Sequence, residues 1–230
     1  MSSDLAPAQM SRQAAGASGS ARPSDPLVEL GGLIAARICH DLVSPVGAIA
    51  NGVDLMREAT GSIEEEVELV RQSTERASAL LRLLRVTFGR VSDDGPPVER
   101  RQIESELRAV IAGRRVVFEV TAIDGPPVAP QAARLAGLMV LCGRHLLGLS
   151  GRVELVFSQD SDLPLRVTAE GAKAAITPAA ARWLAGALDP LPSSREVELA
   201  LTPIAARSTG AVLSCVEGDG SITLTARAAG

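Results

Sequence analysis

The stretch LVELGGLIAARICHDLVSPVGAIANGVDLMRE, residues 27–58, decides the fold of this 230-residue chain. Its apolar side chains recur every three or four residues, which is the spacing of one face of an α-helix. Ser24 and Asp25 precede Pro26, and a capping side chain followed by a proline is a typical helix start. We therefore expect one long helix across this stretch.

A second helical segment covers residues 63–91. Its apolar seam alternates four and three residues apart, as in a coiled coil, and consists of Ile63, Val67, Val70, Thr74, Ala77, Leu81, Leu84, Phe88 and Val91. The two helices should form an antiparallel hairpin, which by itself leaves most of its apolar surface in water. Pairing two hairpins from two chains into an intermolecular four-helix bundle buries that surface, so we expect a homodimer.

The run Ser92-Asp93-Asp94-Gly95-Pro96-Pro97 breaks the helical pattern and indicates a domain boundary. Beyond it we expect helices near 99–112, 130–148, 178–187 and 194–208, and strands at 116–120, 152–158, 164–169, 211–217 and 221–226. The predicted fold class is therefore α+β. It comprises a disordered Ala/Ser/Gly-rich tail at 1–24, a helical hairpin at 25–92 and a two-layer α/β sandwich at 98–230.

The composition narrows the range of partners. The formal net charge is −4 and no basic run exceeds Arg114-Arg115, so we expect neither nucleic acid nor a membrane as a partner. The chain has three Phe, one Trp and no Tyr, which removes most stacking platforms for bases. The three cysteines lack Cys-x-x-Cys spacing, and no apolar run approaches the ~18 residues of a membrane span. We expect a cytoplasmic protein with free thiols that binds other proteins.

His40 lies on a face of the first helix that differs from its apolar stripe. At about 100° per residue, the stripe consists of Leu27, Ile34, Ile38, Leu42, Ile49, Val53 and Met56, and His40 points away from it. Its own face carries Glu29, Leu33, Ala36, Ser44, Gly47, Asn51 and Asp54. Small side chains around the imidazole would let the surface of another protein come close.

The neighbours of His40 favour a nucleophilic role over that of an inert surface histidine. Asp41 can accept a hydrogen bond from one ring nitrogen and leave the other free to attack. Arg37, one turn earlier, can balance the charge of a phosphoryl group. Pro45 removes a backbone hydrogen bond just past the histidine, a defect of little use to a purely structural helix. Phosphoryl transfer then needs in-line positioning and charge neutralisation, which a docked partner with an acidic pocket and Mg²⁺ can supply.

The segment ARICHDLVSP, residues 36–45, resembles the H-[DE]-x-x-x-P phosphoacceptor motif of sensor histidine kinases, with proline five residues after histidine. The layout of residues 27–228 resembles the ChpT-type histidine phosphotransferases of alphaproteobacteria. The resemblance implies a dimer with a kinase-like helical bundle and a degenerate version of the kinase ATP-binding domain. It also implies that His40 is the phosphorylated residue, with Asp41 as its acidic neighbour.

The same resemblance implies a place in a multistep phosphorelay. Proteins of this type take phosphate from the receiver domain of a hybrid histidine kinase. They pass it to response regulators that control the cell cycle, transcription and regulated proteolysis, and they do not autophosphorylate from ATP. Receivers should dock over the face around His40, where we expect Leu33, Ala36, Ser44, Gly47 and Asn51 to contact them, together with part of the C-terminal domain.

The residues themselves support the loss of ATP chemistry. A kinase domain needs an Asn-bearing helix for Mg²⁺, an Asp-x-Gly-x-Gly segment for adenine and a glycine-rich phosphate lid. The 130–148 helix contains no Asn, and the place for Asp-x-Gly reads AEGAK at 169–173. The one late Gly-x-Gly, at 218–220, is better explained as a hairpin turn. We therefore expect no bound nucleotide or other permanent cofactor.

Two other functions stay open from the sequence alone. The first is a non-catalytic dimeric adaptor that binds receiver domains or kinases, and the second, disfavoured by the missing glycine motifs, is an ATP-dependent kinase. His145, the second histidine, lies on an otherwise apolar helix and is expected to be a partly buried packing group. No acidic cluster accompanies the histidines, so the sequence predicts no metal site.

Overall fold

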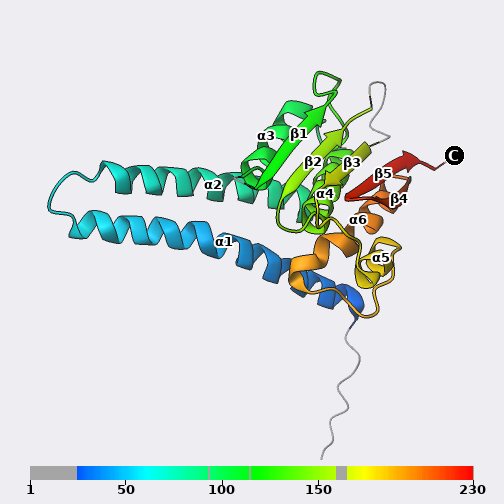
Figure 1. The fold of residues 1–230 in the computed structure, drawn as a ribbon, viewed down its shortest axis with the longest axis horizontal. Coiled ribbons are helices and arrows are strands. Elements are labelled where there is room, and N and C mark those ends of the chain that lie inside the picture. The colour runs from blue at the N-terminus through cyan, green and yellow to red at the C-terminus, as the bar shows by residue number, and fades with distance from the viewer. Residues whose placement is uncertain (1–24, 93, 114, 159–164, 230) are drawn as a thin grey trace, which may run out of the picture.

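A helical hairpin forms the N-terminal part of the computed structural model, which describes residues 25–92, 94–113, 115–158 and 165–229 (Figure 1). The expected tail at 1–24 lies outside these residues. Helix α1 spans Pro26–Glu58 and helix α2 spans Glu64–Phe88. Asp25 caps α1 as expected, because its Oδ1 accepts a hydrogen bond from the backbone N–H of Leu27 at 2.9 Å.

The remaining elements confirm the α+β class. In chain order they are α3 Arg100–Ile111, β1 Val116–Thr121, α4 Pro130–Leu146, β2 Gly151–Val156, β3 Leu165–Glu170, α5 Pro178–Leu184, a short 3₁₀ helix η1 Ser194–Glu196, α6 Val197–Ser208, β4 Ala211–Gly218 and β5 Ser221–Ala228. The five strands form one sheet in the order β1-β2-β3-β5-β4. Strands β1 and β2 pair in parallel and the other neighbours are antiparallel.

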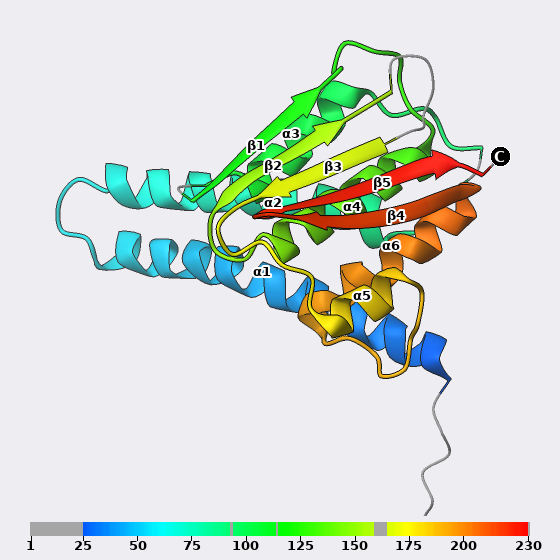
Figure 2. The same cartoon turned by 45° about the vertical axis from the view of Figure 1, so that its right-hand side comes forward.

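One face of the sheet packs against helices. Side chains alternate along each strand, so that Val153 and Leu155 of β2 are buried while their neighbours are more exposed. Helices α3, α4 and α6 lie behind the buried face in Figure 2. In the part of the chain that the structure describes, no helix covers the opposite face. The core is therefore a single, largely aliphatic layer between one sheet and one set of helices.

The base of the hairpin joins this core. Leu30 of α1 and Leu83 of α2 belong to the same buried cluster as the sheet and its helices. Helix α2 packs against α3 and α4, and both η1 and α6 lie against α1 (Figure 2). The α/β part of the chain therefore reaches the stretch of α1 that carries His40.

The buried strip of α1 differs from the expected stripe. Its buried residues are Leu30, Pro45 and Gly52, whereas Leu27 and Val53 of the expected stripe are exposed. The other expected positions, Ile34, Ile38, Leu42, Ile49 and Met56, are half-buried. The difference arises because α2 covers a narrow strip of α1 and the α/β part packs against the side nearer His40. Much of the apolar stripe on the long free end of the hairpin stays open.

The apolar character of α1 is greater than the sequence pattern indicated. It is long and apolar enough to cross a membrane by length and composition alone. The sequence shows no uninterrupted run of large apolar residues, because Gly, Ala, Ser and Pro separate them. Within the helix Arg37 pairs with Asp41 of α1 and with Glu198 of the α/β part, an arrangement that fits a protein interface better than lipid.

Candidate phosphoacceptor site

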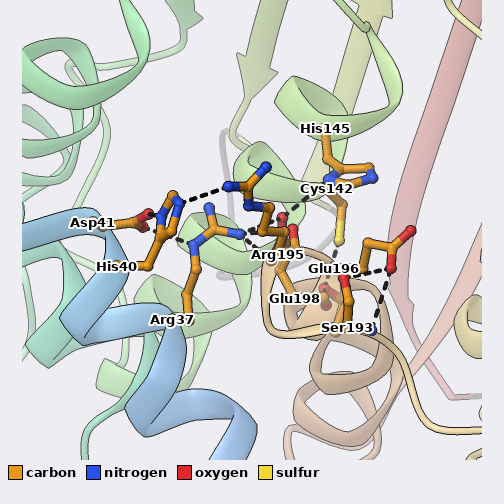
Figure 3. Close-up of polar contacts among 10 residues, drawn as sticks. Arg37, His40, Asp41, Cys142, His145, Ser193, Arg195, Glu196 and Glu198 are labelled. Atoms are coloured by element: carbon orange, nitrogen blue, oxygen red, sulfur yellow. Dashed lines mark hydrogen bonds and ion pairs between the residues drawn. The ribbon is translucent and has the colours of Figure 1, made fainter.

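His40 stands at the junction of α1 with η1 and α6. Its side chain is 51% exposed, so the imidazole reaches solvent as the helix periodicity predicts. The ring is nevertheless held on both sides (Figure 3). Its Nδ1 lies 3.1 Å from Oδ1 of Asp41, and its Nε2 lies 3.0 Å from Nη2 of Arg195.

These two contacts define the state of the ring. A guanidinium has only donors, so Nε2 must accept the hydrogen bond from Arg195 and therefore carries a lone pair. A carboxylate has only acceptors, so Nδ1 must carry the proton and donate it to Asp41. His40 is therefore held as the Nδ1–H tautomer, with its lone pair on Nε2.

Arg37 ties the His40 turn of α1 to the α/β part. Its Nε donates to Oδ2 of Asp41 at 2.7 Å, and its Nη1 lies 3.1 Å from Oε2 of Glu198. The same Nη1 donates to the backbone carbonyl of Arg195 at 2.7 Å. Burial lowers the pKa of Arg37, but the carboxylates of Glu198 and Asp41 more than offset this, so its pKa is raised and its charge is permanent. Asp41 is thus oriented by Arg37 while it holds His40.

Glu198 is the buried centre of this network. Its side chain is only 2% exposed, and it faces Arg37 on one side and His145 on the other, with 3.5 Å between its Oε1 and Nδ1 of His145. The contact with Glu198 raises the pKa of His145 despite its partial burial. His145 is therefore more than a packing residue, because it helps to neutralise a buried carboxylate.

A cavity of about 680 Å³ opens beside the histidine. Hairpin residues such as Ser44 and Leu84 line one side and α4 residues such as Leu141 line another. Its charged lining residues are Arg37, Arg76, Arg144 and Arg195 against Asp41 and Glu198, which leaves a local excess of two positive charges with neutral histidines. The site is therefore locally basic in a chain whose net charge is −4, a setting that attracts anionic groups.

The residues expected to contact partners surround His40 unevenly. Ala36, Ser44 and Asn51 are exposed, and Gly47 is half-buried with open space beside its α-carbon. Leu33 is half-buried because it packs against the α/β core. The open part of the predicted docking face therefore runs along α1 from Ala36 to Asn51, past His40.

Sequence reasoning placed His40, Asp41 and Arg37 together and missed two residues that complete the site. Arg195 and Glu198 lie more than 150 positions away in the sequence, and no local pattern links them to His40. One signal was available: Glu198 is an acidic residue within the mostly apolar first turns of α6, and a buried acid requires a basic partner.

The histidines and carboxylates near the site are not arranged as a metal centre. Among the described residues, no group of three or more His, Cys, Asp and Glu is arranged to hold a metal ion. All three cysteines, Cys39, Cys142 and Cys215, are free thiols as expected.

Known proteins share this arrangement of sequence and fold. Residues 100–221 match the model of the histidine phosphotransferase C-terminal domain family. The protein phosphotransferase ChpT of Brucella abortus (strain 2308) is 42% identical over 72 residues, which cover 31% of this chain and about a third, 34%, of that protein. The solved structure of a bacterial phosphotransferase has a TM-score of 0.71 at 24% identity, covers 87% of this chain and 96% of its own, and shows the same fold.

A histidine kinase of Acinetobacter baumannii, AdeS, aligns over 83% of this chain and 97% of its own with a TM-score of 0.45 and 10% identity, a likeness too distant to carry weight. The match to the family model carries more weight, because it covers more than half of the 230 residues. The Brucella relative adds close identity over part of the chain. The chain therefore belongs to the histidine phosphotransferase family and is of the ChpT type.

Proposed function

We propose that the protein shuttles a phosphoryl group through His40, from the receiver domain of a hybrid histidine kinase to response regulators. One observation carries this proposal: a half-exposed imidazole whose Nδ1 is held by Asp41 and whose Nε2 carries the lone pair. Membership of the histidine phosphotransferase family agrees with it.

The transfer follows from the state of the ring. Nε2 attacks the phosphorus of the receiver's aspartyl phosphate, the bond between phosphorus and the carboxyl oxygen breaks, and the aspartate leaves as a carboxylate. The proton on Nδ1 stays in place, so the phosphorylated ring is cationic, and Asp41 stabilises it at 3.1 Å. Attack by the aspartate of a second receiver on the same phosphorus reverses these steps and frees His40.

The charge of the site suits a receiver partner. A receiver brings an acidic pocket with Mg²⁺, and the positive lining around His40 complements the acidic groups that border such a pocket. Docking over Ala36, Ser44, Gly47 and Asn51 would place the receiver on small side chains, with η1 at its edge. In this proposal Mg²⁺ belongs to the receiver and this chain needs no nucleotide.

The wider setting follows from the resemblance to ChpT-type proteins. We place the protein in the cytoplasm, as a homodimer, in a relay whose response regulators control the cell cycle. The exposed apolar residues of the hairpin support the dimer, because α1 exposes Val43 and Val46 and α2 exposes Val67 and Leu81. A second hairpin is the partner that matches their coiled-coil spacing.

A transfer assay tests the proposal. A receiver domain carrying labelled phosphate is mixed with wild-type protein, with His40→Ala and with Glu58→Gln, an exposed residue at the far end of the same helix, as a control. Label should move to the wild type and to the control and should be absent from His40→Ala. Binding of the receiver without transfer would favour the adaptor instead, and labelling by ATP alone would favour a kinase.

A further inference from the structure

The guanidinium of Arg195 covers Nε2, the ring nitrogen of His40 that would attack phosphorus. Its Nη2 lies 3.0 Å from Nε2, and because a guanidinium can only donate, it covers the lone pair that must attack phosphorus. This contact comes from the α/β part of the chain, 155 positions from the histidine. In the unphosphorylated protein this one hydrogen bond therefore blocks Nε2, and it has to break before transfer.

The backbone of Arg195 is anchored while its guanidinium is free to move. Its carbonyl accepts from Nη1 of Arg37 at 2.7 Å. Its helix η1 begins with a capping box, in which the backbone N–H of Ser193 donates to Oε2 of Glu196 at 3.2 Å. The Arg195 residue itself is exposed. Rotation of the side chain alone can therefore uncover Nε2 without moving η1.

Arg195 is the cation of the cavity lining that contacts Nε2 of His40 and has no ion pair among the described residues. Arg37 was expected to balance the phosphoryl charge, but it is already paired with Asp41 and Glu198. Among the residues that the structure describes, no carboxylate forms an ion pair with Arg195. Arg144 also lines the cavity but donates to the carbonyl of Gly148. A phosphoryl group on Nε2 would therefore meet Arg195 first among these cations.

We propose that Arg195 is a catalytic residue of the α/β part, which selects the Nδ1–H tautomer of His40 at rest and binds the phosphoryl oxygens during and after transfer. The proposal rests on the phosphotransfer function of His40. In the step, the hydrogen bond from Arg195 to Nε2 breaks as the bond from Nε2 to phosphorus forms. The guanidinium then donates to the phosphoryl oxygens, a geometry that arginine suits. The α/β part would thus act directly on His40 through Arg195, and it would not bind a nucleotide.

Phosphoramidate is the probe for this proposal, because it phosphorylates an imidazole without any receiver. Nε2 attacks its phosphorus, the phosphorus–nitrogen bond breaks, and ammonia leaves. We expect Arg195→Ala to slow phosphorylation of His40 about 10- to 100-fold, the effect of losing one charge-assisted hydrogen bond. Arg195→Lys should recover part of the rate. Arg76→Ala removes an equal charge from the cavity lining and should have a smaller effect.

Nitrogen NMR of the imidazole gives a second readout that a merely structural role would not move. The unphosphorylated wild type should show the proton on Nδ1, and Arg195→Ala should shift it partly to Nε2. A wild-type rate or an unchanged tautomer in Arg195→Ala would overturn the proposal, as would equal slowing by Arg76→Ala. If the wild type itself takes no phosphate from phosphoramidate or from a receiver, the relay function fails instead, and the two failures are distinct.

Discussion

Glu198 shows at the scale of one residue how the α/β part holds the helix that carries His40. Its buried carboxylate offsets the charge of Arg37 and contacts His145. We expect Glu198→Gln to lower the free energy of unfolding by about 3 kcal/mol, because it leaves a half-buried guanidinium without a full partner. Urea denaturation measures the change. Glu75→Gln breaks an exposed ion pair with Arg71 and should cost less than about 1 kcal/mol; equal losses would contradict a buried role for Glu198.

His145 makes part of this stability depend on pH. Its pKa is raised in the folded protein by contact with Glu198, against the opposing effects of burial and of Arg37, while Glu196 adds to the rise. A raised folded pKa stabilises the protein fully below the ordinary value, near 6.5, and the gain is lost as pH rises through the folded pKa. The stability difference between wild type and His145→Gln should therefore shrink from about pH 5.5 to about pH 8.5. A constant difference across denaturation curves would show that the two groups are uncoupled.

The sequence predicted the part of the site that lies within one turn of helix. Arg37 and Asp41 are four residues apart, so their ion pair follows from helix geometry. The contacts of Arg195 and Glu198 depend on how α6 docks on α1, which no local pattern specifies. His145 was expected to be a packing group because its neighbours are apolar, and its buried acidic partner comes from a different helix.

At the scale of elements, helices α2 and α4 meet closely at Gly137. A β-carbon there would lie 2.6 Å from Cγ2 of Thr87. We expect Gly137→Ala to destabilise the protein by about 1–3 kcal/mol through overpacking, even though alanine favours a helix. Thr87→Ser removes the methyl group and keeps the hydroxyl that donates to Leu83. In that background Gly137→Ala should cost much less, and equal costs in thermal unfolding of both backgrounds would contradict the close contact.

Most elements could be predicted from periodicity, but their arrangement could not. The final hairpin was readable because alternating residues flank a Gly-Asp-Gly turn, and β4 and β5 pair across it. The parallel pairing of β1 with β2 is not visible in either strand. The buried strip of α1 overlaps the expected stripe but is shifted toward His40, because the α/β part covers that side and a single hairpin covers little of the rest.

At the scale of the whole molecule, the hairpin leaves an apolar surface that a second chain would bury. Leu81 is 51% exposed, whereas Leu84, which the seam pattern makes equivalent, is 4% exposed in the chain's own core. We expect sedimentation to show a wild-type dimer and a folded Leu81→Glu monomer, because a charge in an apolar interface is costly. Leu149→Glu changes a leucine that is exposed away from the hairpin and should remain dimeric. A monomeric wild type would contradict the bundle.

Transfer through Nε2 of His40 is tested most directly by locating the phosphate on the imidazole ring. The chain has only two histidines, so protein labelled with ¹⁵N-histidine gives a simple spectrum. After phosphorylation by a receiver domain, phosphorus–nitrogen coupling should appear at Nε2 of His40 alone. Coupling at Nδ1 of His40, or at His145, would contradict the account.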